Sequence, residues 1–299
     1  MDGREAILYL TSLGLLPLTG WSFMDNTLSK RKIPSTLEEL PCVGIGTWQT
    51  FDVGAAESDR KPLQEVLRNF VEGGASVVDS SPMYGASEKV VGDLSQELNI
   101  NKKLFIATKV WTTGEAAGIS QMNTSFSLLK RNVIDLMQIH NLVDWQTHLR
   151  TLRKWKEQGK VRYIGLTHYT DSAHDTVASI IKNNPVDFIQ INYNLLDRHA
   201  EEKLLPLAQE KKVAVLINRP FEEGALFSQV KGKPLPEWAS EFDCTSWAQL
   251  FLKFILANQA VTCVIPGTSK VTHLLDNLQA GRGKLPESGH IKKMIDLIR

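Results

Sequence analysis

The chain has 299 residues, 42% of them hydrophobic and 22% charged, and its formal net charge is +1. This composition is ordinary for a globular protein with a sizeable core. The neutral charge balance argues against a nucleic-acid partner or an acidic membrane surface. The three cysteines, Cys42, Cys244 and Cys263, are far apart and lack CxxC spacing, so we expect neither a disulfide framework nor a metal site.

Residues 1–29 form an apolar N-terminal segment that differs from the rest of the chain. Its apolar run, residues 6–18, is too short to span a bilayer as a helix, and no other membrane span is predicted. The length suits the core of a signal peptide, but Asp2 and Glu5 offset Arg4 and no A-x-A cleavage site follows. We therefore favour a cytoplasmic protein with an apolar arm. The alternative is export to the periplasm through a degraded twin-arginine-like leader.

From about residue 40 onward, short apolar runs alternate with longer amphipathic stretches. Apolar runs that end in polar residues are typical of parallel strands buried on both faces. The predicted strands are residues 43–47, 76–80, 104–109, 135–140, 162–167, 187–192, 213–218 and 261–266. Helical patterns between them include residues 62–72, 88–98, 147–158 and 201–211. Eight β-then-α units with short connections predict an α/β fold, a (β/α)₈ TIM barrel formed as a single domain by residues 30–299.

Two segments fall outside this alternation. Residues 30–40 precede the first strand, and we expect them to form a hairpin that closes the floor of the barrel. Residues 221–243 follow the seventh strand and contain Gly224, Gly232, Pro234 and Pro236. A long segment at the C-terminal end of a strand is usually a lid or a binding loop.

Three consecutive strands end in residues with acid–base chemistry. Asp79 ends the second strand, Tyr84 lies in the loop after it, and Lys109 and His140 end the third and fourth strands. Barrel enzymes place their catalytic groups at this end of the strands. Each group alone has a structural explanation, but a buried ammonium and a buried carboxylate on adjacent strands are costly unless they pair. We therefore expect the four side chains to share one site.

These four groups fit the transfer of hydride to a carbonyl. A free tyrosine has a pKa of about 10, which is too high for efficient proton transfer at neutral pH. A Lys109–Asp79 pair beside Tyr84 would stabilise the phenolate and lower that pKa. Tyr84 would then protonate the developing alkoxide as a general acid, and His140 would orient the carbonyl oxygen.

The same segments resemble motifs of the aldo-keto reductases, in the same order along the chain. The most specific are SSPMYGASE, which follows Asp79 at residues 80–88, and GKVRYIG at residues 159–165, and the likeness covers roughly residues 31–281. GIGTWQ, ATKVW, DLMQIH, QINYN and IPGTSK continue the series. The resemblance implies an NAD(P)H-dependent reductase of aldehydes or ketones, with Tyr84 as general acid, Lys109 and Asp79 tuning it, and His140 directing the carbonyl.

The resemblance also implies that a nicotinamide cofactor lies across the barrel rim, and no GxGxxG motif follows the first strand to suggest a Rossmann site. Residues 46–48 would border the nicotinamide, and Gln190 would contact its carboxamide. Residues 266–277 would hold the adenosine phosphate, at a helix start that offers N–H groups to an anion. The complete set implied for the cofactor is Gly46, Thr47, Trp48, Thr167, His168, Gln190, Arg219, Pro220, Gly267, Thr268, Ser269, Lys270, His273, Asp276 and Asn277.

Several positions depart from the commoner family pattern. Thr167-His168 stands where Ser-Asn is usual, and residues 218–221 replace a segment with an aromatic ring that stacks on nicotinamide. Arg219 would compensate by lying against that ring or by binding pyrophosphate. His273 stands where many relatives have an arginine for the 2′-phosphate, which leaves Ser269 and Lys270 to recognise it. We expect NADP(H) in preference to NAD(H).

Trp48, Met83 and Trp111 are expected to form an apolar wall around a small-molecule carbonyl substrate. We favour a monomer. The main alternative is a cofactor-binding regulatory or scaffold protein with little turnover, which would resemble the potassium-channel β-subunits. A third interpretation is an unrelated barrel, a hydrolase or lyase in which Lys109 forms a Schiff base.

Overall fold

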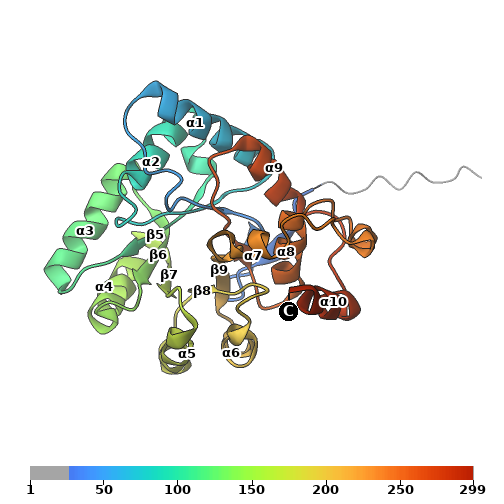
Figure 1. Cartoon of the computed structure of the whole chain (residues 1–299). Coiled ribbons are helices and arrows are strands. Elements are labelled where there is room, and N and C mark those ends of the chain that lie inside the picture. Colours follow the sequence, from blue (N-terminus) through green and yellow to red (C-terminus); the bar gives the residue numbers. More distant parts are fainter. Residues whose placement is uncertain (1–26, 299) are drawn as a thin grey trace, which may run out of the picture.

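The computed structural model describes residues 27–298, and eight parallel strands form its centre (Figure 1). Strands that are neighbours in this sheet are also consecutive in the chain, as expected for β-then-α units. The strands are β3 (Ile45–Gly46), β4 (Val77–Asp79), β5 (Phe105–Val110), β6 (Ile134–His140), β7 (Val161–Thr167), β8 (Phe188–Asn192), β9 (Ala214–Asn218) and β10 (Cys263–Val264). Parallel bridges from Val43 to Val264 and from Gly46 to Gly267 join the first strand to the last. The predicted (β/α)₈ barrel is therefore confirmed.

Helices surround these strands (Figure 1). They are α1 (Glu57–Glu72), α2 (Ser87–Glu97), α3 (Glu115–Leu128), α4 (Trp145–Glu157), α5 (His174–Asn183), α6 (Leu204–Glu210), α7 (Ala225–Gln229), α8 (Trp247–Ala257), α9 (Val271–Gln279) and α10 (Ser288–Ile298). In α1 the buried residues Leu63, Val66, Leu67 and Phe70 recur at the spacing that places them on one helix face. Burying each of these side chains against the sheet contributes about 1.5–3 kcal/mol.

Four predicted elements have clearly different ends in the structure. Strands β3 and β10 are shorter than predicted, because at the seam of the barrel isolated bridges replace a continuous ladder. Helix α1 begins at Glu57 rather than at Pro62. The helix predicted at residues 201–211 begins only at Leu204, after a separate 3₁₀ turn, η3 (His199–Glu201). Pro206 then lies in its first turn, where a missing N–H costs no helical hydrogen bond.

The predicted hairpin is also confirmed. Strands β1 (Lys30–Lys32) and β2 (Glu39–Pro41) pair antiparallel. Ile33 and Leu40 are buried in the inner apolar cluster of the barrel, where they join the strand residues Phe105 and Leu136. The hairpin thus closes the barrel at the end opposite to the strand C-termini.

Residues 221–243 do not form an extended loop. They contain η4 (Glu222–Gly224), helix α7 and η5 (Glu237–Phe242), and the side chains of Leu226 and Phe242 are buried. The lid predicted after β9 is therefore a folded insertion that packs on the barrel. The further 3₁₀ turns are η1 (Asn101–Lys103) and η2 (Asp171–Ala173).

The predicted apolar arm or leader lies outside the described residues, apart from its last three positions. Of these, Leu28 is buried and the Ser29 N–H donates to the Gly281 carbonyl at 2.9 Å. Within residues 27–298, no helix is both long enough and apolar enough to cross a membrane.

Candidate active site

The structure brings Asp79 and Lys109 together inside the barrel. Asp79 ends β4, and Lys109 lies one residue before the end of β5. The Lys109 Nζ donates to Asp79 Oδ2 and to the Ser80 carbonyl, both at 2.7 Å, and both side chains are nearly inaccessible to solvent. Burial lowers the pKa of Lys109, but the adjacent Asp79 and Tyr84 outweigh burial and raise it, so the amine stays charged.

Tyr84 reaches the same ion pair from the loop after β4. Its N–H donates to the Ser81 carbonyl at 3.0 Å, which closes a turn, and Gly85 follows with φ of +58°. That left-handed conformation favours glycine. The turn places the Tyr84 ring 4.8 Å from the Lys109 Nζ, as measured to the ring centroid. The Lys109 ammonium thus lies between the two groups, in contact with the Asp79 carboxylate and close to the Tyr84 ring.

The predicted lowering of the Tyr84 pKa is wrong. Burial of the ring raises the pKa of Tyr84 above its usual value, the charge of Lys109 offsets this only in part, and Asp79 raises it further. Sequence reasoning counted the ammonium but not the loss of water around the hydroxyl. Tyr84 is consequently a neutral phenol at pH 7, which is the state that a proton donor needs.

His140 ends β6 beside this group. Its ring lies edge-on to Tyr84 at a centroid distance of 6.0 Å and 6.3 Å from Trp111. Ser81 Oγ lies 3.2 Å from His140 Nδ1. Burial, then the charge of Lys109 and the nearby His168, lower the pKa of His140 to about 3, so the imidazole is neutral at physiological pH.

Two glutamines complete the surroundings of Asp79. Gln138 Nε2 donates to Asp79 Oδ1 at 3.2 Å, and Gln190 Nε2 donates to Asp79 Oδ2 at 3.0 Å. Gln190 is predicted to contact the carboxamide of the cofactor. In this structure its Oε1 accepts from Gln138, and its Nε2 has a second hydrogen besides the one donated to Asp79. Sequence analysis missed Gln138 and Ser81. Gln138 is two residues before His140 on β6, so strand alternation would have placed both side chains on one face.

The three residues predicted to form a substrate wall are exposed at the rim. Trp48, Met83 and Trp111 have exposed fractions of 44%, 39% and 43%. Trp111 lies 6.3 Å from the His140 ring, measured between ring centroids, and Met83 directly precedes Tyr84 in the chain. These two side chains make this end of the barrel suited to an apolar group attached to the reacting atom.

The predicted cofactor residues form two groups at the rim. In the first, Gly46 and Gly267 face each other across the seam, and a side chain on Gly267 would meet the Gly46 carbonyl at 3.2 Å. Thr47 Oγ1 donates to the Asp79 carbonyl at 3.0 Å, so this hydroxyl supports β4. Thr167 is buried at the end of β7, and His168 Nδ1 accepts from the Thr170 N–H at 3.3 Å.

The second group surrounds the start of α9. Ser269, Lys270 and His273 are exposed, and the side chain of Thr268 accepts from the Lys270 N–H at 3.1 Å. No side chain caps the first turn of α9, so its N–H groups can bind an anion. Asn277 is buried in this helix.

Asp276 has a different environment from the one predicted. Its carboxylate accepts from Ser246 Oγ at 2.8 Å and from Gln249 Nε2 at 2.6 Å. Both partners belong to the start of α8, where Ser246 is the N-cap residue. The two bonds connect α9 to the start of α8, so Asp276 holds α9 in place.

Arg219 and Pro220 follow β9. The Arg219 guanidinium pairs with Glu222 at 2.5 Å and Glu223 at 3.5 Å, and lies 5.8 Å from the centroid of Tyr169. The Nε of Arg219 and the Oδ1 of Asn218 are buried without a hydrogen-bond partner among residues 27–298. Unpaired buried polar atoms are costly, so a polar ligand bound here would stabilise the loop. These atoms, the open α9 start and the side-chain-free seam fit a dinucleotide.

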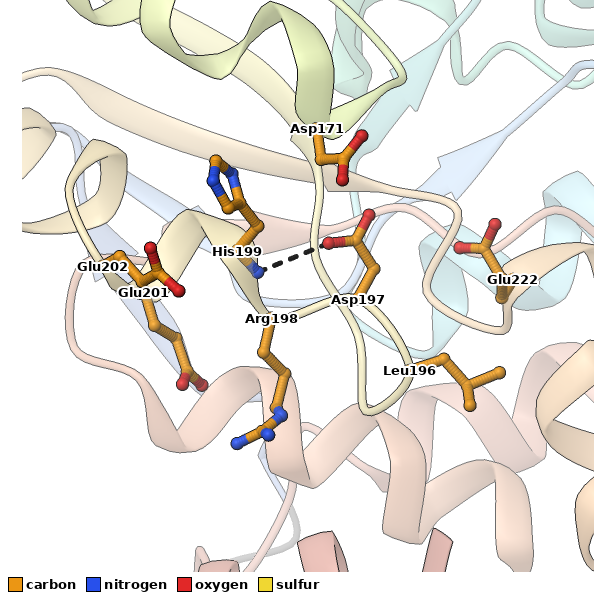
Figure 2. Close-up of a pocket in the computed structure, with 8 residues that line it drawn as sticks. All are labelled: Asp171, Leu196, Asp197, Arg198, His199, Glu201, Glu202 and Glu222. Atoms are coloured by element: carbon orange, nitrogen blue, oxygen red, sulfur yellow. Dashed lines mark hydrogen bonds between the residues drawn. The ribbon is translucent and has the colours of Figure 1, made fainter. Parts of the chain in front are cut away.

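A pocket of about 640 Å³ lies beside this loop (Figure 2). It is lined by Asp171, Leu196, Asp197, Arg198, His199, Glu201, Glu202 and Glu222. Figure 2 shows that its walls come from the segments after β7, β8 and β9. Five of the eight lining residues carry carboxylates, whose charge would repel the phosphates of a dinucleotide. The pocket is therefore poorly suited to the phosphates of a dinucleotide, and it contains none of the four acid–base residues.

The fold and the rim together define a class of protein, the α/β-barrel proteins with an oxidoreductase-type site. In this site a buried ion pair lies beside a neutral phenol and a neutral imidazole. No group of three or more metal-ligating side chains was found among residues 27–298. A sequence model of the Aldo/keto reductase family matches residues 42–292. Because this match spans most of the chain, the protein belongs to the aldo-keto reductase family.

Individual relatives agree with this assignment. Aldo-keto reductase YhdN of Bacillus subtilis is 28% identical over 226 residues, which cover 71% of this chain and 66% of that protein. Methylglyoxal reductase YeaE of Escherichia coli is 27% identical over 246 residues, which cover 80% of this chain and 84% of that protein. The crystal structure of an aldo/keto reductase from Klebsiella pneumoniae with NADP and acetate has a TM-score of 0.75 at 21% identity, covering 88% of this chain and 93% of its own.

Proposed function

We propose that the protein uses NADPH to reduce aldehydes or ketones to alcohols, with Tyr84 as the general acid. The observation that carries this proposal is the contact between a neutral Tyr84 and the buried Lys109–Asp79 pair, at the open rim of the barrel. A bound nicotinamide would supply the hydride to the carbonyl carbon. Tyr84 would give its hydroxyl proton to the oxygen of the same carbonyl.

Lys109 and Asp79 both support this step. Its charge offsets part of the rise in the Tyr84 pKa that burial causes, so the phenolate left after proton transfer is stabilised. Asp79, held by Lys109, Gln138 and Gln190, keeps the ammonium in place. General acid catalysis of this kind contributes about 10²–10⁴-fold to the rate.

His140 would place the carbonyl oxygen next to Tyr84. The low pKa of His140 keeps its ring neutral. A neutral imidazole can donate one hydrogen bond to the carbonyl oxygen, while Tyr84 supplies the proton that this oxygen receives. Trp48, Met83 and Trp111 would contact the apolar part of the substrate and exclude water from the reacting atoms. The half-exposed wall favours aromatic or short aliphatic aldehydes of varied shape.

The cofactor would lie over the seam and the start of α9. The free N–H groups of that helix and the exposed Ser269 and Lys270 would bind the 2′-phosphate, which favours NADP(H) over NAD(H). The NADP-bound relative from Klebsiella pneumoniae supports the same preference. His273, exposed in the first turn of α9, would assist.

The proposal is tested by adding NADPH and 4-nitrobenzaldehyde, or methylglyoxal, and following loss of the reduced cofactor by absorbance. We expect turnover by the wild type, and at least a hundredfold loss in Tyr84→Phe with cofactor binding kept. NADH in a parallel assay measures the preference for the phosphate. Tight cofactor binding without turnover of any carbonyl would favour a regulatory or scaffold role, and failure to bind either cofactor would refute the proposal.

A further inference from the structure

Ser81 makes two contacts that connect the catalytic turn to His140. Its side chain is fully buried. Its Oγ accepts a hydrogen bond from the Met83 N–H at 3.3 Å and lies 3.2 Å from His140 Nδ1. Its carbonyl accepts from the N–H of Tyr84 at 3.0 Å. One residue therefore holds the turn that presents Tyr84 and also touches the ring of His140.

The donors and acceptors of this contact allow only one arrangement that leaves no buried proton unpaired. A serine hydroxyl has one hydrogen to donate and lone pairs to accept with. The Met83 N–H already points at one lone pair of Ser81, which leaves the hydroxyl hydrogen. If His140 Nδ1 carried a proton and donated it to Ser81, that hydroxyl hydrogen would be buried with no acceptor in the contacts of this site, at a cost comparable to a lost hydrogen bond. The reverse direction satisfies both groups.

We propose that Ser81 is a positioning residue that donates its hydroxyl hydrogen to Nδ1 of His140 and so fixes the imidazole as the tautomer protonated on Nε2. This inference rests on the proposed function, in which His140 orients the substrate carbonyl. The Nε2–H is then the hydrogen available to the carbonyl oxygen. The other tautomer would turn a lone pair toward the same oxygen, which repels it.

Two further observations agree with this assignment. The ring must be neutral for a tautomer to exist, and burial together with the charge of Lys109 lowers the pKa of His140 to about 3. The Ser81 carbonyl also fixes the Tyr84 turn, so the proton donor and the orienting hydrogen bond have a common support. Loss of the hydroxyl should therefore redistribute the tautomers while the position of Tyr84 is kept, since the carbonyl remains in Ser81→Ala.

The expected change in kcat depends on how strongly the Ser81 hydrogen bond favours the Nε2-protonated tautomer of His140. A net hydrogen bond shifts an equilibrium by roughly five- to tenfold. Losing it would turn a strong preference for Nε2–H into a near-equal mixture of tautomers, so kcat of Ser81→Ala should fall by about twofold, in proportion to the lost Nε2–H population. KM for the cofactor should stay unchanged, because Ser81 contacts no predicted cofactor residue. Ser81→Cys keeps a weak donor of similar size and should recover part of kcat.

The test is the ¹⁵N spectrum of histidine side chains in the full chain with NADP⁺ bound, because the nitrogen shifts distinguish protonated from unprotonated ring positions. The His140 signals are identified by their loss in His140→Asn. We expect Nε2–H alone in the wild type and a mixture in Ser81→Ala. Ser87→Ala, which removes another fully buried hydroxyl at the start of α2, should leave the His140 signals unchanged.

Each result decides the proposal separately from the reaction. An Nδ1-protonated ring in the wild type, or identical spectra and kcat for wild type and Ser81→Ala, would overturn the role of Ser81. If the wild type reduces no carbonyl, the proposed function fails, and the ¹⁵N signals still report which tautomer Ser81 selects.

Discussion

Replacing Lys109 by methionine tests the buried ion pair that supports Tyr84. Methionine keeps most of the side-chain length but removes the charge and both hydrogen bonds from Nζ, to Asp79 Oδ2 and to the Ser80 carbonyl. Asp79, with a side chain only 3% exposed, would keep its carboxylate without a counter-charge. We expect Lys109→Met to lower the free energy of unfolding at pH 7.

The magnitude follows from the partners that remain. Removing one partner of a buried ion pair costs about 3–5 kcal/mol. Asp79 would still accept from Gln138 at 3.2 Å and Gln190 at 3.0 Å, which reduces the penalty. We therefore expect about 3 kcal/mol, at the lower end of that range. Because Asp79 and Tyr84 raise the pKa of Lys109, the loss should be the same across neutral pH and should shrink only in strongly alkaline solution, as the wild-type amine loses its proton.

The assay is urea unfolding of the wild type, Lys109→Met and the double variant Lys109→Met/Asp79→Asn. The double variant carries neither charge of this pair, so it should recover about half of the loss or more. A loss of less than about 1 kcal/mol in the single variant, or a double variant less stable than the single one, would refute the view that the carboxylate needs the ammonium.

Three further predictions concern the rim. His140 has a pKa of about 3 in the folded protein and about 6.5 in the unfolded chain, so between these values only the unfolded chain gains a proton on this residue. The free energy of unfolding of the wild type should therefore fall relative to that of His140→Asn by about 1.4 kcal/mol per pH unit from pH 6 to pH 4. If urea unfolding gave the same pH dependence for both proteins, this prediction would be wrong. Gly85→Ala should lower the free energy of unfolding more than Gly159→Ala. Both glycines have a positive φ, but only a Cβ at position 85 would meet the Asp52 carboxylate, at 2.2 Å. Equal unfolding midpoints for the two variants would exclude that clash. Glu222→Gln should free Arg219 from its shorter ion pair and lower the Kd for the cofactor by roughly two- to fivefold. Glu223→Gln, which removes the longer pair, should lower it less. Unchanged Kd values in both variants would show that Arg219 does not contact the cofactor.

Much of the barrel was predictable because its strands are buried on both faces. Such strands read as apolar runs that end in polar residues, and parallel strands bring those ends to one rim. Asp79, Lys109 and His140 could be placed together on this basis alone. Tyr84 needed the turn after β4, which the glycine at position 85 indicates.

The parts that could not be predicted depend on which loop groups meet. Nothing in the sequence shows that Arg219 is paired by Glu222, because both adopt positive φ in a loop of irregular shape. The sign of the Tyr84 pKa shift depends on how much water the fold removes, which spacing does not show. Asp276 is predicted to contact the cofactor from its place in the segment 266–277. In the structure it bonds instead to Ser246 and Gln249, which lie 30 and 27 residues earlier in the chain, and the sequence does not show that these residues meet.

Transfer of deuterium from labelled cofactor tests the central claim most directly. The protein is mixed with NADPH carrying deuterium at C4 of the nicotinamide and with 4-nitrobenzaldehyde, and the alcohol is examined by mass spectrometry. We predict deuterium on the former carbonyl carbon with wild type, and an unlabelled, unreduced aldehyde with Tyr84→Phe although that variant binds the cofactor. Labelled alcohol formed equally fast by Tyr84→Phe, or no labelled alcohol with wild type and bound cofactor, would contradict the account.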